Sequence, residues 1–101
     1  MNSNSSFDSL IHNETPVLVD FHATWCGPCK TLVPILEQVK QTLGDNIKIV
    51  KIDVDKNPTL ARQLNISGVP TLILYRAGKL ISRKSGVVPA HEIIKMIENC
   101  A

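Results

Sequence analysis

Two cysteines three positions apart, Cys26 and Cys29, are the residues of this chain best suited to chemistry. They stand in Trp25-Cys26-Gly27-Pro28-Cys29, where an apolar, β-branched run ends and a helical pattern begins. On the first turn of a helix, this spacing can bring two sulfur atoms to bonding distance. Unpaired N–H groups and the helix dipole there favour an anion, so the pKa of Cys26 should fall. Cys29 lies one turn deeper on the apolar stripe and should stay protonated until it is needed.

A C-x-x-C pair has three interpretations, of which a redox pair fits this chain best. Half of a zinc site is one alternative, but neither Cys100 nor the three histidines supply a matching second pair of ligands. A structural disulfide is another alternative, which a reducing intracellular compartment would oppose. A C-x-x-C beside a strand–helix–strand pattern is typical of redox chemistry. We therefore expect a redox-active Cys26–Cys29 disulfide and no metal site.

One acidic residue, Asp20, interrupts the apolar run 17–21 shortly before the cysteines. Burial penalises an isolated carboxylate, so the pKa of Asp20 should rise. Such a carboxylate beneath a buried thiol is suited to act as the general base that deprotonates Cys29. Lys51, in the neighbouring apolar run, is expected to tune Asp20. The alternative for Lys51 is an ordinary ion pair or a solvent-facing side chain.

The composition excludes several classes of protein. The 101 residues, 44% of them hydrophobic, fit one domain with ample aliphatic residues for a core. Three cysteines are too few for a disulfide-stapled mini-protein. A net charge of +2 without a basic stripe argues against nucleic acid as a partner. No apolar run approaches the ~20 residues of a membrane span, and the first residues lack a secretory signal, so we expect a cytoplasmic protein.

Strand and helix patterns alternate along the chain and predict a small α/β fold. Helices are predicted at 7–13 with Ser6 as N-cap, at 29–43, at 58–64, and from Pro89 with an inner stripe of Ile93, Ile94 and Ile97. Strands are predicted at 17–21, 47–54, 71–76 and 80–84. This order implies a parallel portion of the sheet, with a late hairpin as its antiparallel edge. The cysteines lie at the first strand-to-helix junction.

The residues around the cysteine pair resemble those of a known family. The segment 21–30, Phe-His-Ala-Thr-Trp-Cys-Gly-Pro-Cys-Lys, is similar to the thioredoxin active site. The thioredoxin pattern is also matched, in order, by Asp20, Pro34, Lys51-Ile52-Asp53-Val54-Asp55 and Val69-Pro70-Thr71. The resemblance runs from about Phe7 to the C-terminus. It implies a thioredoxin fold, a mixed central sheet of four main strands flanked by helices.

The resemblance also implies a protein-disulfide reductase that acts in general thiol redox homeostasis and as an electron donor to reductases and peroxidases. Cys26 would be the nucleophile and Cys29 the resolving thiol. Pro70 would be cis and pack against both, and Val69 would offer backbone hydrogen bonds to an extended substrate. The implied docking surface consists of Trp25, Gly27, Pro28, Val69, Pro70 and Gly86.

Two kinds of partner follow from this resemblance. Disulfide-containing proteins would be the targets, and a separate NADPH-dependent flavoprotein, a thioredoxin reductase, would restore the dithiol. No cofactor is expected to be bound to the chain itself, because it lacks a dinucleotide fingerprint.

The chain departs from the family pattern in three places. His22 stands where the family usually has a large aromatic residue; it either packs there or, when protonated, alters the ionisation of Cys26. Only six residues precede Phe7, so we expect the N-terminal edge strand to be absent or vestigial, with 1–6 outside a single domain of 7–101. The exposed edge at 47–54 would then allow weak self-association of a monomeric protein. Cys100 is either a small core residue or a second route to association.

Two other functions stay open at this point. An oxidase or isomerase of disulfides could use the same fold, although Pro28 argues against it because oxidising relatives often carry histidine there. The other is a binding module in which the redox pair is incidental. An intact cysteine pair together with Asp20 argues against binding as the sole role.

Overall fold

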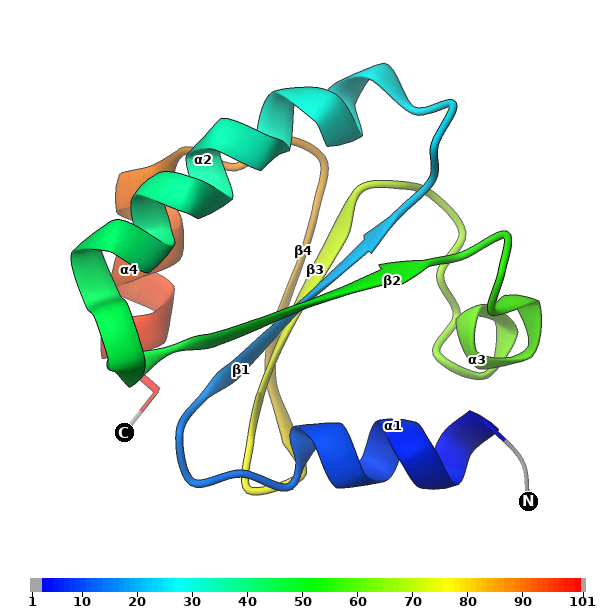
Figure 1. The fold of residues 1–101 in the computed structure, drawn as a ribbon, viewed down its shortest axis with the longest axis horizontal. Coiled ribbons are helices and arrows are strands. Elements are labelled where there is room, and N and C mark those ends of the chain that lie inside the picture. Colours follow the sequence, from blue (N-terminus) through cyan, green and yellow to red (C-terminus); the bar gives the residue numbers. More distant parts are fainter. Residues whose placement is uncertain (1–2, 101) are drawn as a thin grey trace.

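The computed structural model describes residues 3–100 and contains a four-stranded sheet with helices on both faces (Figure 1). In chain order the elements are α1 (Ser3–Ile11), β1 (Val17–His22), α2 (Gly27–Leu43), η1 (Gly44–Asn46), β2 (Lys48–Asp53), α3 (Pro58–Gln63), β3 (Thr71–Arg76), β4 (Lys79–Ser85) and α4 (Ala90–Glu98). Apart from the short 3₁₀ turn η1, this is the predicted order. The predicted mixed sheet flanked by helices is therefore confirmed.

The strands lie in the order β2-β1-β3-β4. β1 runs parallel to β2 because α2 crosses over one face of the sheet between them, whereas β3 is antiparallel to both β1 and β4. The hairpin between β3 and β4 turns through Ala77 and Gly78, which have φ values of 51° and 82°. A Cβ on Gly78 would come within 2.5 Å of His12 Nε2, so the turn needs glycine for space as well as conformation.

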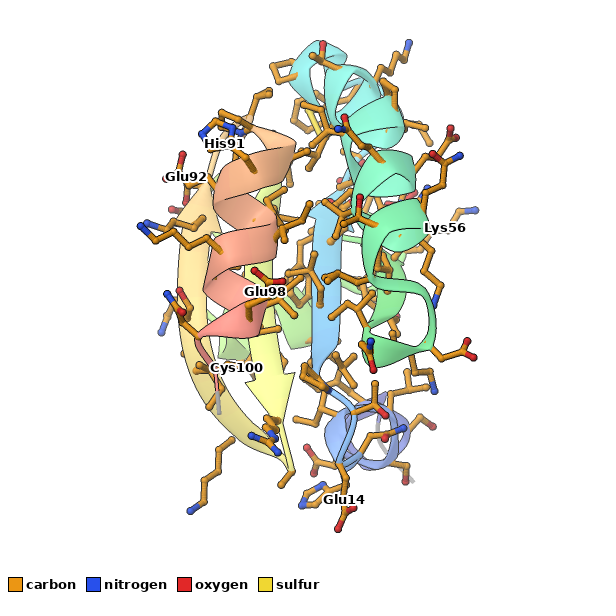
Figure 2. The ribbon with its side chains drawn as sticks, turned by 90° about the vertical axis from the view of Figure 1, so that its left-hand side faces the viewer. Glu14, Lys56, His91, Glu92, Glu98 and Cys100 are labelled. Atoms are coloured by element: carbon orange, nitrogen blue, oxygen red, sulfur yellow. A yellow bond between two sulfur atoms is a disulfide. The ribbon has the colours of Figure 1, made fainter. Side chains whose placement is uncertain are left out.

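Each face of the sheet has its own hydrophobic core. α2 and α4 lie on one face, seen in front of the sheet in Figure 2, and they pack against Leu18, Leu72 and Leu74. α1 and α3 lie on the other face, where Phe7 of α1 meets the ring of Tyr75 edge-on at a centroid distance of 5.6 Å. Alternation along β1 therefore points Leu18, Asp20 and His22 toward α2, and their neighbours toward α1.

The first helix begins earlier than the sequence predicted. α1 starts at Ser3 and ends at Ile11, so Ser6 lies inside the helix and is not its N-cap. Serine and asparagine have modest helix propensity, but Phe7 and Ile11 are buried against the sheet, and this packing overrides local preference. The expectation that 1–6 lies outside the fold is wrong for 3–6, and residues 1–2 lie outside the described residues.

β2 forms one edge of the sheet. Within residues 3–100 no strand precedes α1, and nothing pairs with the outer side of β2. The N–H of Lys48 donates to Pro16 O and that of Val54 to His22 O, so alternate groups of this strand face β1. The N–H and C=O groups of Ile49, Lys51 and Asp53 point outward.

Candidate active site

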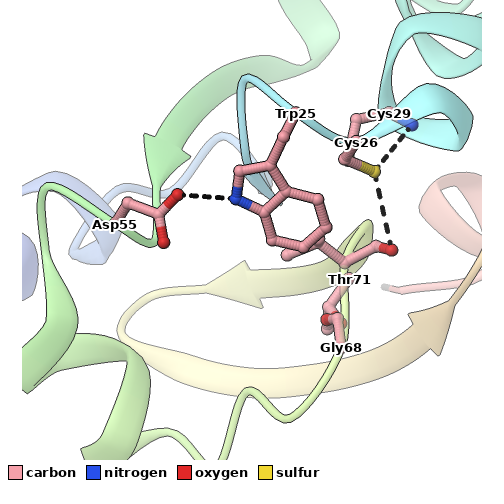
Figure 3. Close-up of a disulfide and its surroundings, with 7 residues drawn as sticks. Trp25, Cys26, Cys29, Asp55, Gly68 and Thr71 are labelled. Atoms are coloured by element: carbon pink, nitrogen blue, oxygen red, sulfur yellow. Dashed lines mark hydrogen bonds between the residues drawn. A yellow bond between two sulfur atoms is a disulfide. The ribbon is translucent and has the colours of Figure 1, made fainter.

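The two cysteines form a disulfide at the start of α2 (Figure 3). Cys26 is the N-cap of that helix, with φ −88° and ψ 112°, and its sulfur accepts a 3.1 Å hydrogen bond from the N–H of Cys29. Gly27 and Pro28 fill the exposed first turn, where proline costs no hydrogen bond. An acceptor sulfur at a helix N-terminus is the arrangement that lowers a thiol pKa once the bond is reduced. Both cysteines are buried, at 3% and 5% exposure.

The loop before β3 lies against the sulfur of Cys26. The Val69–Pro70 peptide bond is cis, and Cys26 Sγ lies 3.7 Å from the carbonyl oxygen of Val69 (Figure 3). Two further bonds fix this loop: Thr71 Oγ1 donates to Gly68 O at 2.7 Å, and the N–H of Gly86 donates to Pro70 O at 2.9 Å. Residues 69–71 and Gly86, which are distant in sequence from the cysteines, thus lie beside the disulfide.

Trp25 provides an exposed apolar surface next to the disulfide. Its side chain is 70% exposed, and its indole N–H donates a 2.8 Å hydrogen bond to Asp55 Oδ2 (Figure 3). Asp53 holds the loop after β2, because its Oδ1 accepts the N–H groups of Asp55 and Lys56. Sequence reasoning missed the role of Asp55, although it lies in a segment that matched the family pattern.

Asp20 lies behind the disulfide with almost no access to water. Its side chain is 3% exposed, and its Oδ1 is buried without a hydrogen-bond partner among the described residues. Burial therefore raises the pKa of Asp20 above its ordinary value, opposed by the charges of His22 and then Lys51. Lys51 stands opposite Asp20 in the parallel register of β1 and β2. The sequence predicted the burial of Asp20 but not the influence of His22. Lys51 is exposed, and its tuning of Asp20 stays a prediction.

A cavity of about 250 Å³ is lined by both Asp20 and Cys29. Its lining includes Asp20, His22, Thr24, Cys29, Lys30 and Lys51. The cavity lies between β1, β2 and α2, on the face of β1 that carries both Asp20 and His22. The one signal for this space in the sequence is His22, at a position where the family usually has a large aromatic residue.

Cys100 belongs to a different part of the molecule. It follows α4 (Figure 2) and is 7% exposed, within the core between α2, α4 and the sheet. Its carbonyl accepts a 2.9 Å hydrogen bond from Arg76 Nη1 at the end of β3. The Val69–Pro70 loop, which contacts Cys26, lies at the opposite end of that strand. Among residues 3–100, no cluster of His, Cys, Asp or Glu is arranged to hold a metal ion, and no helix is long and apolar enough to cross a membrane.

A family model agrees with this geometry. The model named thioredoxin matches residues 1–99. The chain belongs to the thioredoxin family. The fold supports this membership: mitochondrial thioredoxin 3 of Saccharomyces cerevisiae superposes with a TM-score of 0.85 at 34% identity, covering 95% of this chain and 89% of that one. The thioredoxin fold implied by the sequence is therefore confirmed.

Curated relatives give two further findings. The chain is 52% identical over 96 residues to chloroplastic thioredoxin Y2 of Arabidopsis thaliana, and 49% identical over 96 residues to chloroplastic thioredoxin Y of Oryza sativa. These matches cover 94% of this chain in both cases, but 58% and 57% of the relatives, so it spans little more than half their length. The expected cytoplasmic location is contradicted, because these relatives and the similar thioredoxin z are chloroplastic proteins.

Proposed function

We propose that this thioredoxin-family chain is a thiol–disulfide oxidoreductase that reduces disulfides of other proteins. One observation carries the proposal. The Cys26–Cys29 disulfide lies at a helix N-terminus, against the Val69–Pro70 loop and beside the exposed ring of Trp25. This arrangement combines a thiol that readily ionises with an apolar surface on which a protein substrate can dock.

The reaction transfers two electrons from the dithiol to the target. The Cys26 thiolate attacks one sulfur of the target disulfide, forming a mixed disulfide and releasing one target thiolate. Cys29 then loses its proton and attacks Cys26 Sγ; the intramolecular disulfide forms as the bond to the target breaks. The target leaves with two thiols, and the chain is left in the oxidised form described above.

Asp20 is the proposed base for the second step. It shares a cavity with Cys29, and its raised pKa suits it to take a proton from a buried thiol near neutral pH. Lys51, across the cavity and opposite Asp20 in the sheet, is the proposed partner that limits the rise of this pKa. Once protonated, Asp20 must lose its proton before the next turnover.

The target is proposed to dock on the surface around the disulfide. An extended target segment would pair with the backbone of Val69. Its apolar side chains would contact Trp25 and the other residues of this surface, Gly27, Pro28, Pro70 and Gly86. A separate NADPH-dependent flavoprotein reductase is the proposed electron source. The carbonyl oxygen of Val69 already lies beside the sulfur that the target must reach.

Insulin reduction with dithiothreitol as electron donor tests the proposal without needing the partner reductase. We expect the chain to accelerate precipitation of the insulin B chain, and Cys26→Ser and Cys29→Ser to abolish this acceleration. Cys100→Ser is the matched control and should retain it, because Cys100 lies in another core. Cys29→Ser should also trap a mixed disulfide through Cys26, visible by mass spectrometry. A wild-type chain no faster than dithiothreitol alone would disprove the reductase function.

A further inference from the structure

The proposed base, Asp20, exposes almost none of its side chain to bulk water. Its side chain is 3% exposed and one carboxylate oxygen has no partner among residues 3–100. Each turnover leaves a proton on this carboxylate, and the proton must leave before Asp20 can act again. The cavity that Asp20 shares with Cys29 is therefore the way out, and its volume of about 250 Å³ is sufficient for several water molecules.

His22 is the group in this cavity that can pass a proton on. It lies two positions after Asp20 on β1, so both side chains face α2, and both line the cavity. Unlike Asp20, it is only partly buried and has contact with solvent. Imidazole can accept a proton at one ring nitrogen and donate one from the other, so His22 can pass a proton between Asp20 and water.

The other charged groups around the cavity cannot accept a proton from Asp20 or are engaged elsewhere. Lys51 on β2 and Lys30 on α2 line it, and an ammonium group has donors but no acceptor. Asp53 on β2 stands opposite His22 in the register, but its carboxylate accepts two backbone N–H groups of the following loop. Cys29 on α2 is the source of the proton.

We propose that His22 relays to solvent the proton that Asp20 takes from Cys29, and that its protonation state makes the resolving step depend on pH. The proposal rests on the reductase function above. Cys29–SH gives its proton to the Asp20 carboxylate; the Cys29 thiolate forms the disulfide and the target thiolate leaves. The proton then passes from Asp20 to the neutral imidazole of His22 and on to water, restoring both groups. His22 acts through Asp20 and is a positioning residue for the reaction.

The charge of His22 also acts on Asp20 before any transfer. The imidazolium lowers the pKa of Asp20, against the rise due to burial, so a protonated His22 keeps more of the carboxylate ionised. A neutral His22 exerts no such effect, so the charge of His22 acts on Asp20 in addition to the relay. An aromatic residue at position 22 could neither exchange a proton nor contribute a charge.

The two chemical steps can be separated with dithiobis-nitrobenzoate, an aromatic disulfide that releases a coloured thiolate at each step. Cys26 releases the first thiolate and Cys29 the second. In a Cys100→Ser background we expect His22→Gln to leave the first phase unchanged and to slow the second roughly tenfold near pH 7, less than loss of a direct base. The variant should also alter the pH dependence of the second phase. His91→Gln, on the exposed start of α4, is the matched control and should leave both phases unchanged.

Chemical rescue separates a relay from a structural role. Added imidazole should restore the second phase in His22→Ala, where the side chain is absent, and should leave the wild type unaffected. Should His22→Ala not fold, imidazole is added to His22→Gln, whose second phase should then rise with buffer concentration. An unchanged second phase in His22→Gln at all pH values, or a slowed one that imidazole leaves unaltered, would overturn the relay. If the wild type releases neither thiolate, the reductase function itself fails.

Discussion

The indole of Trp25 is hydrogen-bonded to Asp55, from a loop 30 residues further along the chain, at 2.8 Å. Because the ring is 70% exposed, packing alone does not fix its orientation. The Asp55 carboxylate supplies that constraint, and Asp53 holds the loop that carries it. The end of β2 thereby determines how the main apolar surface beside the disulfide is presented.

Removing the Asp55 carboxylate should weaken substrate docking. We expect Asp55→Ala to lower kcat/KM for insulin reduction about fivefold, equivalent to a hydrogen bond of about 1 kcal/mol. Trp25 is the single tryptophan, so its fluorescence should change in the same variant. Asp45→Ala, exposed in η1, is the control. An unaltered kcat/KM together with altered fluorescence would show that the orientation of the ring does not matter for docking.

Replacing Asp20 should stabilise the oxidised protein near neutral pH. Burial raises the pKa of Asp20 in the folded state above its ordinary value of 3.8. At pH values between the unfolded-state pKa and the folded-state pKa, the folded protein therefore binds more protons than the unfolded protein. The free energy of unfolding is then highest below the unfolded-state pKa and falls as pH rises through the folded-state pKa. Asn carries no charge, so Asp20→Asn should be more stable by about 1–3 kcal/mol near pH 7.

Urea unfolding at two pH values checks this expectation. The difference between Asp20→Asn and wild type should shrink toward about pH 3, where both side chains are neutral. Asp45→Asn, at an exposed position, should show no such difference at either pH. A lower stability of Asp20→Asn at pH 7 would mean that the ionised carboxylate has compensating interactions in solution.

The open edge of β2 should be protected from pairing by its lysines. Lys48 and Lys51 are exposed on this edge, and lysines at a sheet edge oppose strand-to-strand association. We expect a monomer by sedimentation velocity, and concentration-dependent association for Lys48→Val. Lys56→Val lies beyond the strand and serves as the control. Equal sedimentation of Lys48→Val and wild type over the whole concentration range would count against the edge as a site of association.

Cys100 should behave as a core residue. It is 7% exposed in the core beside α4, and in the reduced protein we expect it to react with iodoacetamide roughly a hundred times more slowly than Cys26, because Cys26 lies at a helix N-terminus that favours its thiolate. Cys100→Ala should cost about 1 kcal/mol of stability while leaving insulin reduction intact. Mass spectrometry of timed samples identifies which cysteine is alkylated. Rapid labelling of Cys100 would instead support its role in forming dimers.

The residues that carry the chemistry could be predicted from the sequence more accurately than the ends of the helices could. Cys26, Cys29 and Asp20 were predictable because their spacing and the apolar run around Asp20 each have a direct physical meaning. The start of α1 was not, because Ser3 joins a helix that depends on the burial of Phe7 and Ile11. These contacts are made with distant strands.

The partners of the site were also beyond sequence reasoning. Asp55 was missed because its bond to Trp25 depends on how the end of β2 meets the β1–α2 loop. For His22, the sequence suggested an effect on Cys26, but strand alternation places it on the same face as Asp20. The Trp25–Asp55 contact exists only after the sheet has formed, whereas the placement of His22 required the strand to extend one residue beyond the predicted 17–21.

The disulfide has a small apolar cluster of its own, separate from the cores on the two faces of the sheet. Ala23, Cys26 and Cys29 form it, with Val54 and Val69 packed against them. Val54 also packs against the core on the α1 and α3 face, so the cluster meets that core at one side chain. Cycling between dithiol and disulfide should therefore change side-chain packing chiefly around the two cysteines.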